Sequence, residues 1–599
     1  MQDGDAFHGD AFLGVAKSAT GRLWRRRPCD ERLGIAISQR LGLSDLMGQL
    51  LAARGQNLET AESYLAPRLR DLMPDPARFR DMEAAAARLA DAVAAGEQVA
   101  IFGDYDVDGA TSTAVLTRFL RAVGAPPPIL YVPDRLKEGY GPNAAAMAAL
   151  KAQGARLVIT VDCGITAFQP LAAAHDLGLE VIVVDHHVAE PRLPVAHAVV
   201  NPNRLDEEAG FGQLAAVGVA YLVAVAVNRT LRQRGHYSGQ RPEPDLLQWL
   251  DIVALGTVAD VVPLTGINRA LVAQGLKVMA GRRNPGLAAL ADVARINERP
   301  SAYHAGFLLG PRVNAGGRVG RSDLGARLLT TDDPAEARAL AAELDALNAE
   351  RREIEAAVLD AAIAQAEAHA ADSPYLIFAA ARDWHPGVIG IVAGRLKERY
   401  QRPACVVAIE NGVGKGSGRS VAGLHLGNAI IAAREAGILE KGGGHAMAAG
   451  FEIPEPRLPD LMAFLAARFG DHMNGAHLQP VLDLDAALQP GAASNDFVGA
   501  LERMGPFGAG NAEPRFALPN VRLAFADIVG GAHLRLQVEG ADGQRLKAIA
   551  FRAAENELGA LLTTARGSRL HLAGHLRRDT WQGRDSVQLI VEDAALAGK

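Results

Sequence analysis

Residues 179–190 of the chain read LEVIVVDHHVAE, an apolar run that ends in three consecutive polar side chains. The apolar part has the length of a buried strand. Asp185, His186 and His187 follow it directly, and all three carry atoms that bind metal ions. Polar residues are also common in the turns after strands, so this stretch leaves two interpretations open: the rim of an active site, or a polar turn.

Two further stretches repeat this pattern. The other strand candidates are QVAIFGD (98–104) and ARLVITVD (155–162), and each precedes a turn and a helical stretch. Such repetition over residues 98–330 predicts a parallel, doubly wound α/β sheet, in which ligands bind beyond the carboxyl ends of the strands. Every candidate strand ends in an acidic group. The apolar run VALGTVADVVPL (253–264) is expected to place Asp260 at or near a further strand end.

Three aspartates alternate in the stretch FGDYDVDGATST (102–113), namely Asp104, Asp106 and Asp108. Like charges this close repel, so a cation or strong hydrogen bonds must balance them. The order D-x-D-x-D-G also matches the start of a calcium-binding EF-hand loop. That loop needs an acidic residue at its twelfth position, where this chain has Val115, so the EF-hand interpretation fails.

Asp162 and Asp260 extend this acidic edge, so four separate segments offer carboxylate or imidazole groups there. A single aspartate of this kind is more often a turn or helix cap, but four such segments in succession favour a shared site. Mixed Asp and His ligands without cysteine suit Mn²⁺ or Mg²⁺ more than structural zinc. The number of ligands exceeds what one ion needs, and therefore predicts a two-metal cluster.

The composition limits the class of protein. A chain of 599 residues predicts several domains, and its three cysteines are too far apart for a disulfide framework. The first residues lack the pattern of a secretory signal, and the apolar runs are interrupted before they could span a membrane. We therefore expect a soluble, cytoplasmic protein without a membrane partner. The net charge of −6 averages over several domains and does not decide whether nucleic acid binds.

The remainder of the chain divides into three further segments. Residues 335–371 contain neither Pro nor Gly and predict one long helix. We interpret it as a connector between domains; a packed bundle helix is the alternative, disfavoured because no helices of similar length flank it. A second α/β unit follows over about 373–472. Short alternating strands over about 475–599 predict a small all-β barrel.

The motifs together resemble a known superfamily. An Asp-His-His triplet after a strand, with DYDVDG upstream and a lone aspartate between, resembles the DHH phosphoesterases, and within them the RecJ family of single-strand-specific exonucleases. The resemblance covers about residue 80 to the C-terminus, in the same order along the chain. The supporting stretches are GPRVNAGGRVG (310–320), WHPGVIGIVAGRL (384–396), GRSVAGLHL (418–426), KGGGHAMAAGF (441–451) and GPFGAGNAEPRF (505–516).

The resemblance implies a domain order. Two α/β domains, a DHH parallel sheet and a DHHA1 domain, would be joined by the long helix and followed by an OB-like barrel. The expected segments are a flexible N-terminus (1–22), a DHH domain with N-terminal helical decoration (23–334), a connecting helix (335–372), a DHHA1 domain (373–474) and an OB-fold nucleic-acid-binding domain (475–599).

The resemblance also implies residue roles in the DHH domain. Asp106 and Asp108 would each bind one metal ion, Asp162 would bridge the two ions, and His186 and Asp260 would complete the second ion's ligands. Asp104 would be a further ligand or an orienting group, and His187 would contact the scissile phosphate. Asp185 would hold an imidazole in the correct tautomer. Phe102 stands where many DHH enzymes carry a metal-binding histidine, which leaves the occupancy of the first ion open.

Phosphate binding is expected in the second α/β unit. Consecutive glycines can bring backbone N–H groups close to a phosphate, and the resemblance assigns this role to the GGGH motif (442–445). A flexible glycine turn is the alternative. The stretch GVGKGSG (412–418) lacks the spacing of a P-loop. The candidate substrate-binding residues are Arg419, Ser420, Gly443, Gly444 and His445, with Arg318 and Arg321 from NAGGRVGRSD (314–323).

The C-terminal barrel is expected to bind single-stranded nucleic acid. The candidate stacking residues are Phe507, Phe516, Phe551 and Trp581, although phenylalanines in a small barrel are more often core. The candidate backbone contacts are Arg577, Arg578 and Arg584.

The function implied by the resemblance is a metal-dependent 5′→3′ exonuclease that degrades single-stranded DNA to mononucleotides in recombination and repair. The implied partners are single-stranded DNA, a single-strand-binding protein and a RecQ-type helicase, and the chain is expected to be a monomer. One alternative is an oligoribonuclease, nucleotide phosphatase or cyclic-dinucleotide phosphodiesterase for very short substrates. Another is a scaffold without catalysis, against which the presence of all five metal ligands speaks.

Overall fold

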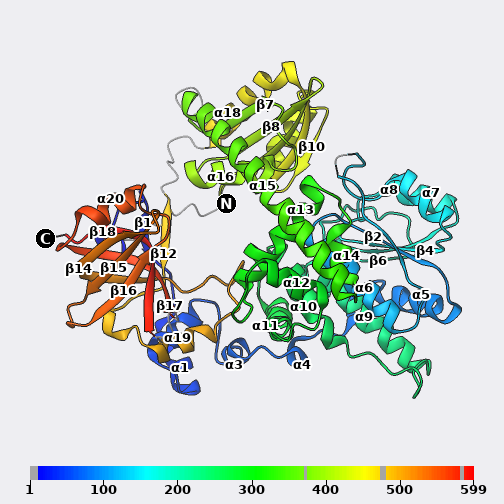
Figure 1. Cartoon of the computed structure of the whole chain (residues 1–599), viewed down its shortest axis with the longest axis horizontal. Coiled ribbons are helices and arrows are strands. Elements are labelled where there is room, and N and C mark those ends of the chain that lie inside the picture. Colours follow the sequence, from blue (N-terminus) through cyan, green and yellow to red (C-terminus); the bar gives the residue numbers. More distant parts are fainter. Residues whose placement is uncertain (1–10, 136, 370–373, 473–479, 580–585, 599) are drawn as a thin grey trace, which may run out of the picture. The chain divides into compact units, whose positions relative to one another are not determined.

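The computed structural model describes residues 11–135, 137–369, 374–472, 480–579 and 586–598 (Figure 1). The chain forms two compact units. One contains Met1–Leu72, Pro263–Ala273 and Leu478–Lys599, and the other contains Met73–Val262 and Gln274–His477. Among the described helices, none combines the length and apolar character needed to cross a membrane.

The larger unit begins with a five-stranded, fully parallel sheet of order β3-β2-β4-β5-β6. Its central strands are β2 (Val99–Gly103), β4 (Leu157–Val161) and β5 (Glu180–Val184), which confirm the three strands expected from the sequence. The edge strands β3 (Ile129–Tyr131) and β6 (Ala198–Val200) are only three residues long. Strands this short carry too little periodicity to be recognised in a sequence.

Helices cover both faces of this sheet, as the doubly wound prediction requires. Side chains of alternate strand residues, such as Phe102 and Val183, pack with α7 (Ala144–Ala152) and α8 (Phe168–Asp176) in one core. The other face is covered by α6 (Val107–Ala122) and α9 (Ala216–Gln233). Burial on both faces explains why these strands read as continuous apolar runs.

The apolar run before Asp260 is a helix, so the expected strand there is wrong. Residues Leu250–Ala259 form α10, and Asp260 is its C-cap residue. The first eight of the ten residues of α10, Leu250 to Thr257, are buried. A helix buried all round has no polar stripe, and its sequence cannot be distinguished from a buried strand by periodicity.

The predicted long helix is α15, which runs for 35 residues from Pro334 to Ala368. Its first half contacts α12 (Pro285–Val293), α13 (Gly310–Val319) and α14 (Leu324–Thr330). Its second half packs Val358 and Ala362 into a core of the next sheet. The helix therefore joins two domains while buried against each of them. As expected, the described helices that pack on it are much shorter than α15, with 7 to 12 residues each.

The second sheet has five strands in the order β10-β11-β9-β8-β7. The strands β7 (Ile377–Arg382) and β8 (Ala404–Glu410) and the helix α16 (Ile389–Tyr400) between them confirm the expected α/β unit. The remaining strands are antiparallel: β9 (Val413–Arg419), β10 (Lys441–Gly444) and β11 (Ala448–Pro454). The helices α17 (Leu426–Glu435) and α18 (Leu458–His472) pack on one face.

The smaller unit is built on the predicted C-terminal barrel. The expected strands appear as β15 (His533–Glu539), β16 (Arg545–Ala550), β17 (Arg569–Asp579) and β18 (Ser586–Leu596). A further strand, β14 (Phe516–Val529), was not predicted, and its pairing with both β15 and β17 closes the barrel. The whole chain therefore has the predicted class: two α/β domains joined by a long helix, and an all-β barrel.

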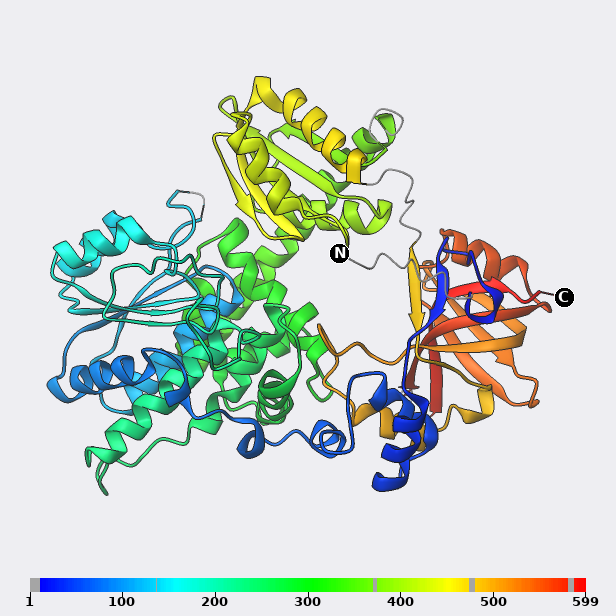
Figure 2. The same ribbon diagram turned by 180° about the vertical axis from the view of Figure 1, so that it is seen from behind.

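The N-terminal segment belongs to the barrel unit, so the expected boundary at residue 23 does not match the packing. Ile37 of α1 (Glu31–Leu41) and Met47 of α2 (Asp45–Ala52) share one core with the barrel strands. The strand β1 (Leu23–Arg26) pairs in parallel with β12 (Val481–Leu484), as Figure 2 shows. Val15 is also buried there, while residues 1–10 of the expected flexible N-terminus lie outside the described residues. Contacts between such distant segments leave no local signal in the sequence.

Candidate metal centre

The structure brings the predicted ligands together at the carboxyl edge of the first sheet. Asp104 follows β2, Asp106 is the N-cap residue of α6, and Asp108 lies in the first turn of that helix. Asp162 and His186 follow β4 and β5, and Asp260 comes from the end of α10. Three ligand sets have donor atoms within 4.8 Å of one another: Asp104–Asp106–Asp162, Asp108–His186–Asp260 and Asp162–His186–His187.

His186 lies at the middle of the cluster. Its Nε2 is 3.3 Å from an Asp162 oxygen, 3.8 Å from an Asp108 oxygen and 3.7 Å from an Asp260 oxygen. Its Nδ1 is 3.1 Å from the Leu214 carbonyl oxygen, so this nitrogen carries the proton and donates it there. The hydrogen bond leaves a lone pair on Nε2, which is the atom that faces the carboxylates.

The backbone also orients Asp108. Its two oxygens accept hydrogen bonds from the N–H groups of Ala216 (2.7 Å) and Val217 (2.9 Å) at the start of α9. The positive end of a helix dipole stabilises a carboxylate in this position. Helix α9 therefore supports the site, although it contributes no ligand side chain.

Asp185 and His187 form a hydrogen-bonded pair beside the cluster. An oxygen of the buried Asp185 accepts from His187 Nδ1 at 2.7 Å and from the N–H groups of His186 and His187. Burial alone would raise the pKa of Asp185, but these hydrogen bonds lower it overall. Burial alone would lower the pKa of His187, but the bond and charge of Asp185 raise it overall. The predicted orienting role of Asp185 is thus directed at His187.

The electrostatics fit divalent cations. Burial, together with the neighbouring carboxylates, raises the pKa values of Asp104, Asp108 and Asp162 well above the ordinary range, and that of Asp260 to about 7. One oxygen each of Asp104 and Asp260 is buried and accepts no hydrogen bond. Within the described part of the chain, no Lys or Arg lies within ion-pair distance of these carboxylates. Positive charge must therefore come from bound ions.

Phe102 contributes nothing to this centre. Its ring is fully buried and stacks on Tyr131, with centroids 5.2 Å apart. The ring belongs to the core between the sheet and α7 and α8. Asp104, two residues further along the chain, has a buried oxygen that accepts no hydrogen bond.

Three arginines without a carboxylate partner among the described residues lie near one another, since the charge of Arg135 acts on Asp104, on Arg318 and on Arg419. Burial, followed by the charge of Arg135, lowers the pKa of Arg318 to about 10 and also lowers that of Arg419. The Arg135 guanidinium lies over the Tyr105 ring, 4.9 Å from its centroid. Clustered guanidinium groups are of the chemical type that binds phosphate through charge-assisted hydrogen bonds.

Sequence reasoning missed Arg135 and Tyr140. The Tyr140 hydroxyl donates to the Asp162 carbonyl oxygen at 3.0 Å and lies 3.5 Å from His187 Nδ1. Both residues come from the segment between β3 and α7, in the stretch PDRLKEGYG (133–141). A polar loop after a strand was the available signal, but the edge strand β3 was itself not recognised.

The GGGH motif, the next candidate phosphate contact, lies at the edge of the second sheet. Gly443 and Gly444 form the edge strand β10, which pairs with β11, so the motif is neither a flexible turn nor a nest of consecutive N–H groups. The exposed His445 follows it, and the neighbouring Met447 accepts from the Ser420 N–H. Arg419 therefore lies beside the GGGH motif.

Two further candidates are engaged elsewhere. The Ser420 hydroxyl is buried and donates to the Leu424 carbonyl oxygen at 2.8 Å, so it is not free for a phosphate. Arg321 is exposed and paired with Asp323 at 2.7 Å. The phosphate contacts expected of Ser420 and Arg321 stay predictions, and both side chains are engaged within the chain in this structure.

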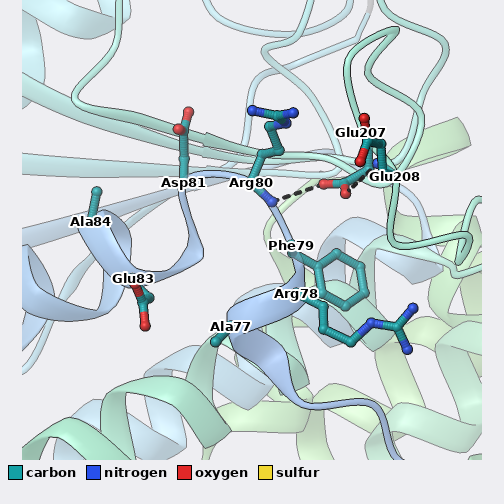
Figure 3. Close-up of a pocket in the computed structure, with 9 residues that line it drawn as sticks. All are labelled: Ala77, Arg78, Phe79, Arg80, Asp81, Glu83, Ala84, Glu207 and Glu208. Atoms are coloured by element: carbon teal, nitrogen blue, oxygen red, sulfur yellow. Dashed lines mark hydrogen bonds between the residues drawn. The ribbon is translucent and has the colours of Figure 1, made fainter.

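A separate hollow of about 380 Å³ lies elsewhere on the larger unit (Figure 3). Its lining consists of Ala77, Arg78, Phe79, Arg80, Asp81, Glu83, Ala84, Glu207 and Glu208, none of which belongs to the metal centre. Its polar groups are largely satisfied, since the Arg80 N–H donates to Glu207 and its guanidinium to the Asp206 carbonyl oxygen. The hollow is a shallow surface feature and not the reaction site.

The structure describes most of the barrel residues that were candidates for contacts with nucleic acid. Phe516 is fully buried and Phe507 packs against the core, whereas Phe551 is 54% exposed. Arg577 and Arg578 form ion pairs with Glu513 and Glu502. Trp581 and Arg584 lie outside the described residues.

Comparison with known proteins places the chain in a family. Family models match at residues 98–257 (DHH family, N-terminal domain), 372–471 (DHHA1 domain) and 484–593 (RecJ OB domain). The fold and the site define a DHH-type hydrolase with an appended OB domain. The single-stranded-DNA-specific exonuclease RecJ of Dickeya dadantii is 39% identical over 84% of this chain and 88% of that protein. The chain belongs to the RecJ family.

Other relatives agree. The single-stranded-DNA-specific exonuclease RecJ of Salmonella typhimurium is 36% identical over 96% of this chain and 99% of that protein. The crystal structure of RecJ from Thermus thermophilus in complex with Mn²⁺ superposes with a TM-score of 0.79 at 31% identity, and covers 95% of this chain and 79% of that one. A Mg²⁺ complex of the same protein gives a TM-score of 0.73. Both ions are thus found in solved relatives.

Proposed function

We propose that this chain is a metal-dependent exonuclease that hydrolyses single-stranded DNA from its 5′ end to mononucleotides, in DNA recombination and repair. The observation that carries the proposal is the convergence of Asp and His ligands from four segments. Among the described residues these carboxylates have no Lys or Arg partner, and the three arginines near them have no carboxylate partner. The relatives that match nearly the whole chain are named single-stranded-DNA-specific exonucleases, which favours this function over a phosphatase or oligoribonuclease for very short substrates.

The proposed roles follow the geometry. Asp106 and Asp108 would hold one ion each, Asp162 would bridge them, and His186 and Asp260 would complete the second ion's ligands. Two Mn²⁺ or Mg²⁺ ions held there would supply an activated water nucleophile and offset charge on the phosphoryl oxygens.

The surrounding residues act on the substrate. His187, held through Nδ1 by Asp185, keeps Nε2 available to a non-bridging or leaving oxygen of the scissile phosphate. Arg135, Arg318 and Arg419 hold a terminal 5′ phosphate at the Asp104 end and thereby fix which bond is cut. An interior phosphodiester lacks the second negative charge of a terminal phosphate, so this receptor favours digestion from an end.

Partners and location are part of the same proposal. The barrel would bind the single strand, and a single-strand-binding protein and a RecQ-type helicase would supply it. We propose a monomer in the cytoplasm, which sedimentation of the purified chain and fractionation of cells would test.

The direct test of the function is digestion of one strand labelled at either end, with the matching duplex as a control and with Mn²⁺ and Mg²⁺ in turn. We expect labelled mononucleotide to appear first from the 5′ label, only from the single strand and only with metal. Release first from the 3′ label would contradict the polarity, and turnover confined to short oligomers would favour the alternative.

A first prediction concerns Asp162. Asp162→Ala should abolish cleavage, by at least about a thousandfold if it removes a bridging ligand, while strand binding is retained. Asp162→Asn should do the same and keep the backbone, because asparagine also tolerates the left-handed conformation (φ 60°) found there. Undiminished cleavage by either variant would refute the bridging role.

A further inference from the structure

An exposed aromatic pair lies on the surface of the larger unit. The side chains of Tyr303 and Phe307 are 53% and 71% exposed, and Phe307 is the most exposed large apolar residue among those described. Their rings stack on each other, with centroids 5.3 Å apart and planes inclined by 26°. The pair therefore presents flat apolar surface to solvent instead of burying it.

The segment that carries the pair packs on the helix that delivers Asp260. Phe307 belongs to the π-helical segment His304–Leu309, which continues into α13. A β-carbon on Gly306 would lie 3.2 Å from Val258 Cγ1, and one on Gly310 would lie 3.3 Å from Ala259 Cβ. This segment thus packs on the last turn of α10, whose C-cap residue is Asp260. Phe307 directly follows Gly306, one of the two residues that make this contact.

The same segment also contacts the start of α6. The Asn314 side chain accepts a hydrogen bond of 3.1 Å from the N–H of Val107, the residue between Asp106 and Asp108. Two independent contacts, at Ala259 and at Val107, therefore fix the segment with the aromatic pair relative to the ligands.

The residue after Asp260 adds a second observation. Val261 is 70% exposed and has a left-handed backbone (φ 62°), which is unfavourable for a β-branched residue. The structure keeps an apolar side chain in solvent at the rim of the site in spite of this strain. Strained backbone of this kind is concentrated at functional sites.

The two ends of the ligand cluster therefore differ in chemistry. Arg135, Arg318 and Arg419 adjoin the end with Asp104 and Asp106, where a phosphate terminus is expected. The exposed apolar groups adjoin the end with Asp260, and single-stranded DNA offers a matching group, the unpaired base. In a duplex each base is stacked between neighbours and paired, so its face is not available.

We propose that Tyr303 and Phe307 form a stacking surface for an unpaired nucleobase of the strand beyond the scissile phosphate, and so act as positioning residues. This inference rests on the proposed function, and it assigns to the metal-bearing domain itself part of the preference for single strands.

Steady-state kinetics of the full-length protein test the proposal. For a 5′-phosphorylated single-stranded oligonucleotide with Mn²⁺, Phe307→Ala should raise KM by about tenfold and leave kcat nearly unchanged, since stacking on an aromatic residue accounts for this much per base. Phe307→Trp should restore KM, whereas Phe307→Leu, which is apolar but not aromatic, should not. Leu205→Ala is the matched control, because Leu205 is 68% exposed on the same unit and should leave both constants unchanged.

Substrates with a single abasic position provide a test in the unaltered protein. Moving this position along the strand should reveal one site at which the loss of the base raises KM by the same factor. With the abasic position at that site, Phe307→Ala should raise KM no further, because the base and the ring form one contact. Thermal unfolding of each variant keeps a folding defect separate from a lost contact.

Three outcomes would overturn the inference: an unchanged KM in Phe307→Ala, full activity of Phe307→Leu, or an abasic penalty that persists undiminished in Phe307→Ala. Full activity of Phe307→Leu would instead point to a general apolar contact, such as a protein partner. A failure of the proposed function can be told apart from a failure of this inference, because the unaltered protein would then release no nucleotides from a single strand with either metal.

Discussion

Asp162 shows how a single residue can be fixed from several directions. Its N–H donates to the Val184 carbonyl oxygen at 3.0 Å, its own carbonyl accepts from the Tyr140 hydroxyl, and its carboxylate faces His186. Its left-handed backbone turns the chain out of β4 directly into the site. Aspartate tolerates this conformation better than most residues, so its position serves both the turn and the proposed bridge between ions.

At the same scale, variants of Arg419 and Arg321 distinguish a direct phosphate contact from the general effect of surface charge. Arg419→Ala should raise KM for a 5′-phosphorylated strand by about tenfold to a hundredfold, as expected for the loss of a charge-assisted hydrogen bond. The effect should be smaller for a strand with a 5′ hydroxyl.

The control is Arg321→Ala. Arg321 was also a candidate from the sequence, but it is exposed and paired with Asp323, so its removal should leave KM within about twofold. Equal effects of the two variants would show that Arg419 acts only through the general field of the protein.

Metal removal should destabilise the larger unit. The free energy of unfolding should rise on addition of Mn²⁺ to the metal-free protein, by about 2.7 kcal/mol when the ion is at a hundred times its Kd. The physical reason is that the buried carboxylates repel one another without a cation. Thermal unfolding in EDTA and in Mn²⁺ measures this shift, and Asp162→Ala should show a smaller one. An identical unfolding temperature with and without the ion would contradict a metal centre.

At the scale of elements, short segments position the reactive groups. The start of α9 donates two N–H groups to Asp108, and the end of α10 delivers Asp260. In the barrel, an ion pair joins β17 and β18. His575 Nε2 lies 2.8 Å from Glu592, which also pairs with Arg515 at 2.6 Å. This pair is half-buried between adjacent strands, and it predicts a pH dependence of stability.

The direction of this pH dependence follows from the pKa shifts of Glu592 and His575. Burial would raise the pKa of Glu592, but His575 and Arg515 lower it to about 2, from an ordinary value of 4.5. Its stabilising contribution is therefore complete above about 4.5 and is lost as the pH falls toward 2. Burial would lower the pKa of His575, but Glu592 raises it above 6.5, so its contribution is complete below that value and is lost as the pH rises.

Glu592→Gln should consequently reduce the free energy of unfolding most between about pH 4.5 and 6.5, by roughly 1–3 kcal/mol, and less on either side. Urea unfolding followed by Trp fluorescence at three pH values checks this. Glu502→Gln, which removes an exposed ion pair with Arg578, should cost less than about 0.5 kcal/mol. A loss for Glu592→Gln that does not vary with pH would contradict the proposed coupling.

At the scale of the whole molecule, the barrel depends on the distant N-terminal segment. Ile37, Met47, Leu50 and Leu51 are buried in the same core as the barrel strands. The indole N–H of Trp24, which precedes them in the same N-terminal segment, donates to the fully buried Asp593 at 2.9 Å. Residues 478–599 alone would leave this core exposed.

A truncation experiment tests this dependence. The fragment 478–599 should unfold without cooperativity or aggregate, because burying each such apolar side chain contributes about 1.5–3 kcal/mol. Co-expression with residues 1–72 should restore a cooperative transition. A fragment that unfolds cooperatively at the same temperature with and without that segment would show that the N-terminal helices are decoration after all.

Much of the fold and of the site could be predicted because their signals are local. The apolar strands β2, β4 and β5, each ending in an acidic group, define the parallel sheet and its reactive edge without reference to anything distant. The same holds for α15, whose residues after the initial Pro334 include neither Pro nor Gly. Asp104, Asp106, Asp108, Asp162 and His186 were all predicted as site residues, and the structure brings their side chains together.

Other features depended on contacts that no local pattern carries. Asp260 was placed on a strand because a helix buried all round and a buried strand look alike in sequence. Ser420 and Arg321 resembled phosphate ligands by motif alone, whereas Leu424 and Asp323 already engage them.

By itself, the sequence determined the family, the order of the domains and the ligand types, because strand ends and motifs are written in consecutive residues. Only the tertiary structure decided which groups are free to act. Arg135, Tyr140 and the pair Tyr303 and Phe307 gained their significance from neighbours far along the chain. Burial and pairing are properties of the space around a side chain, and residues distant in sequence create that space.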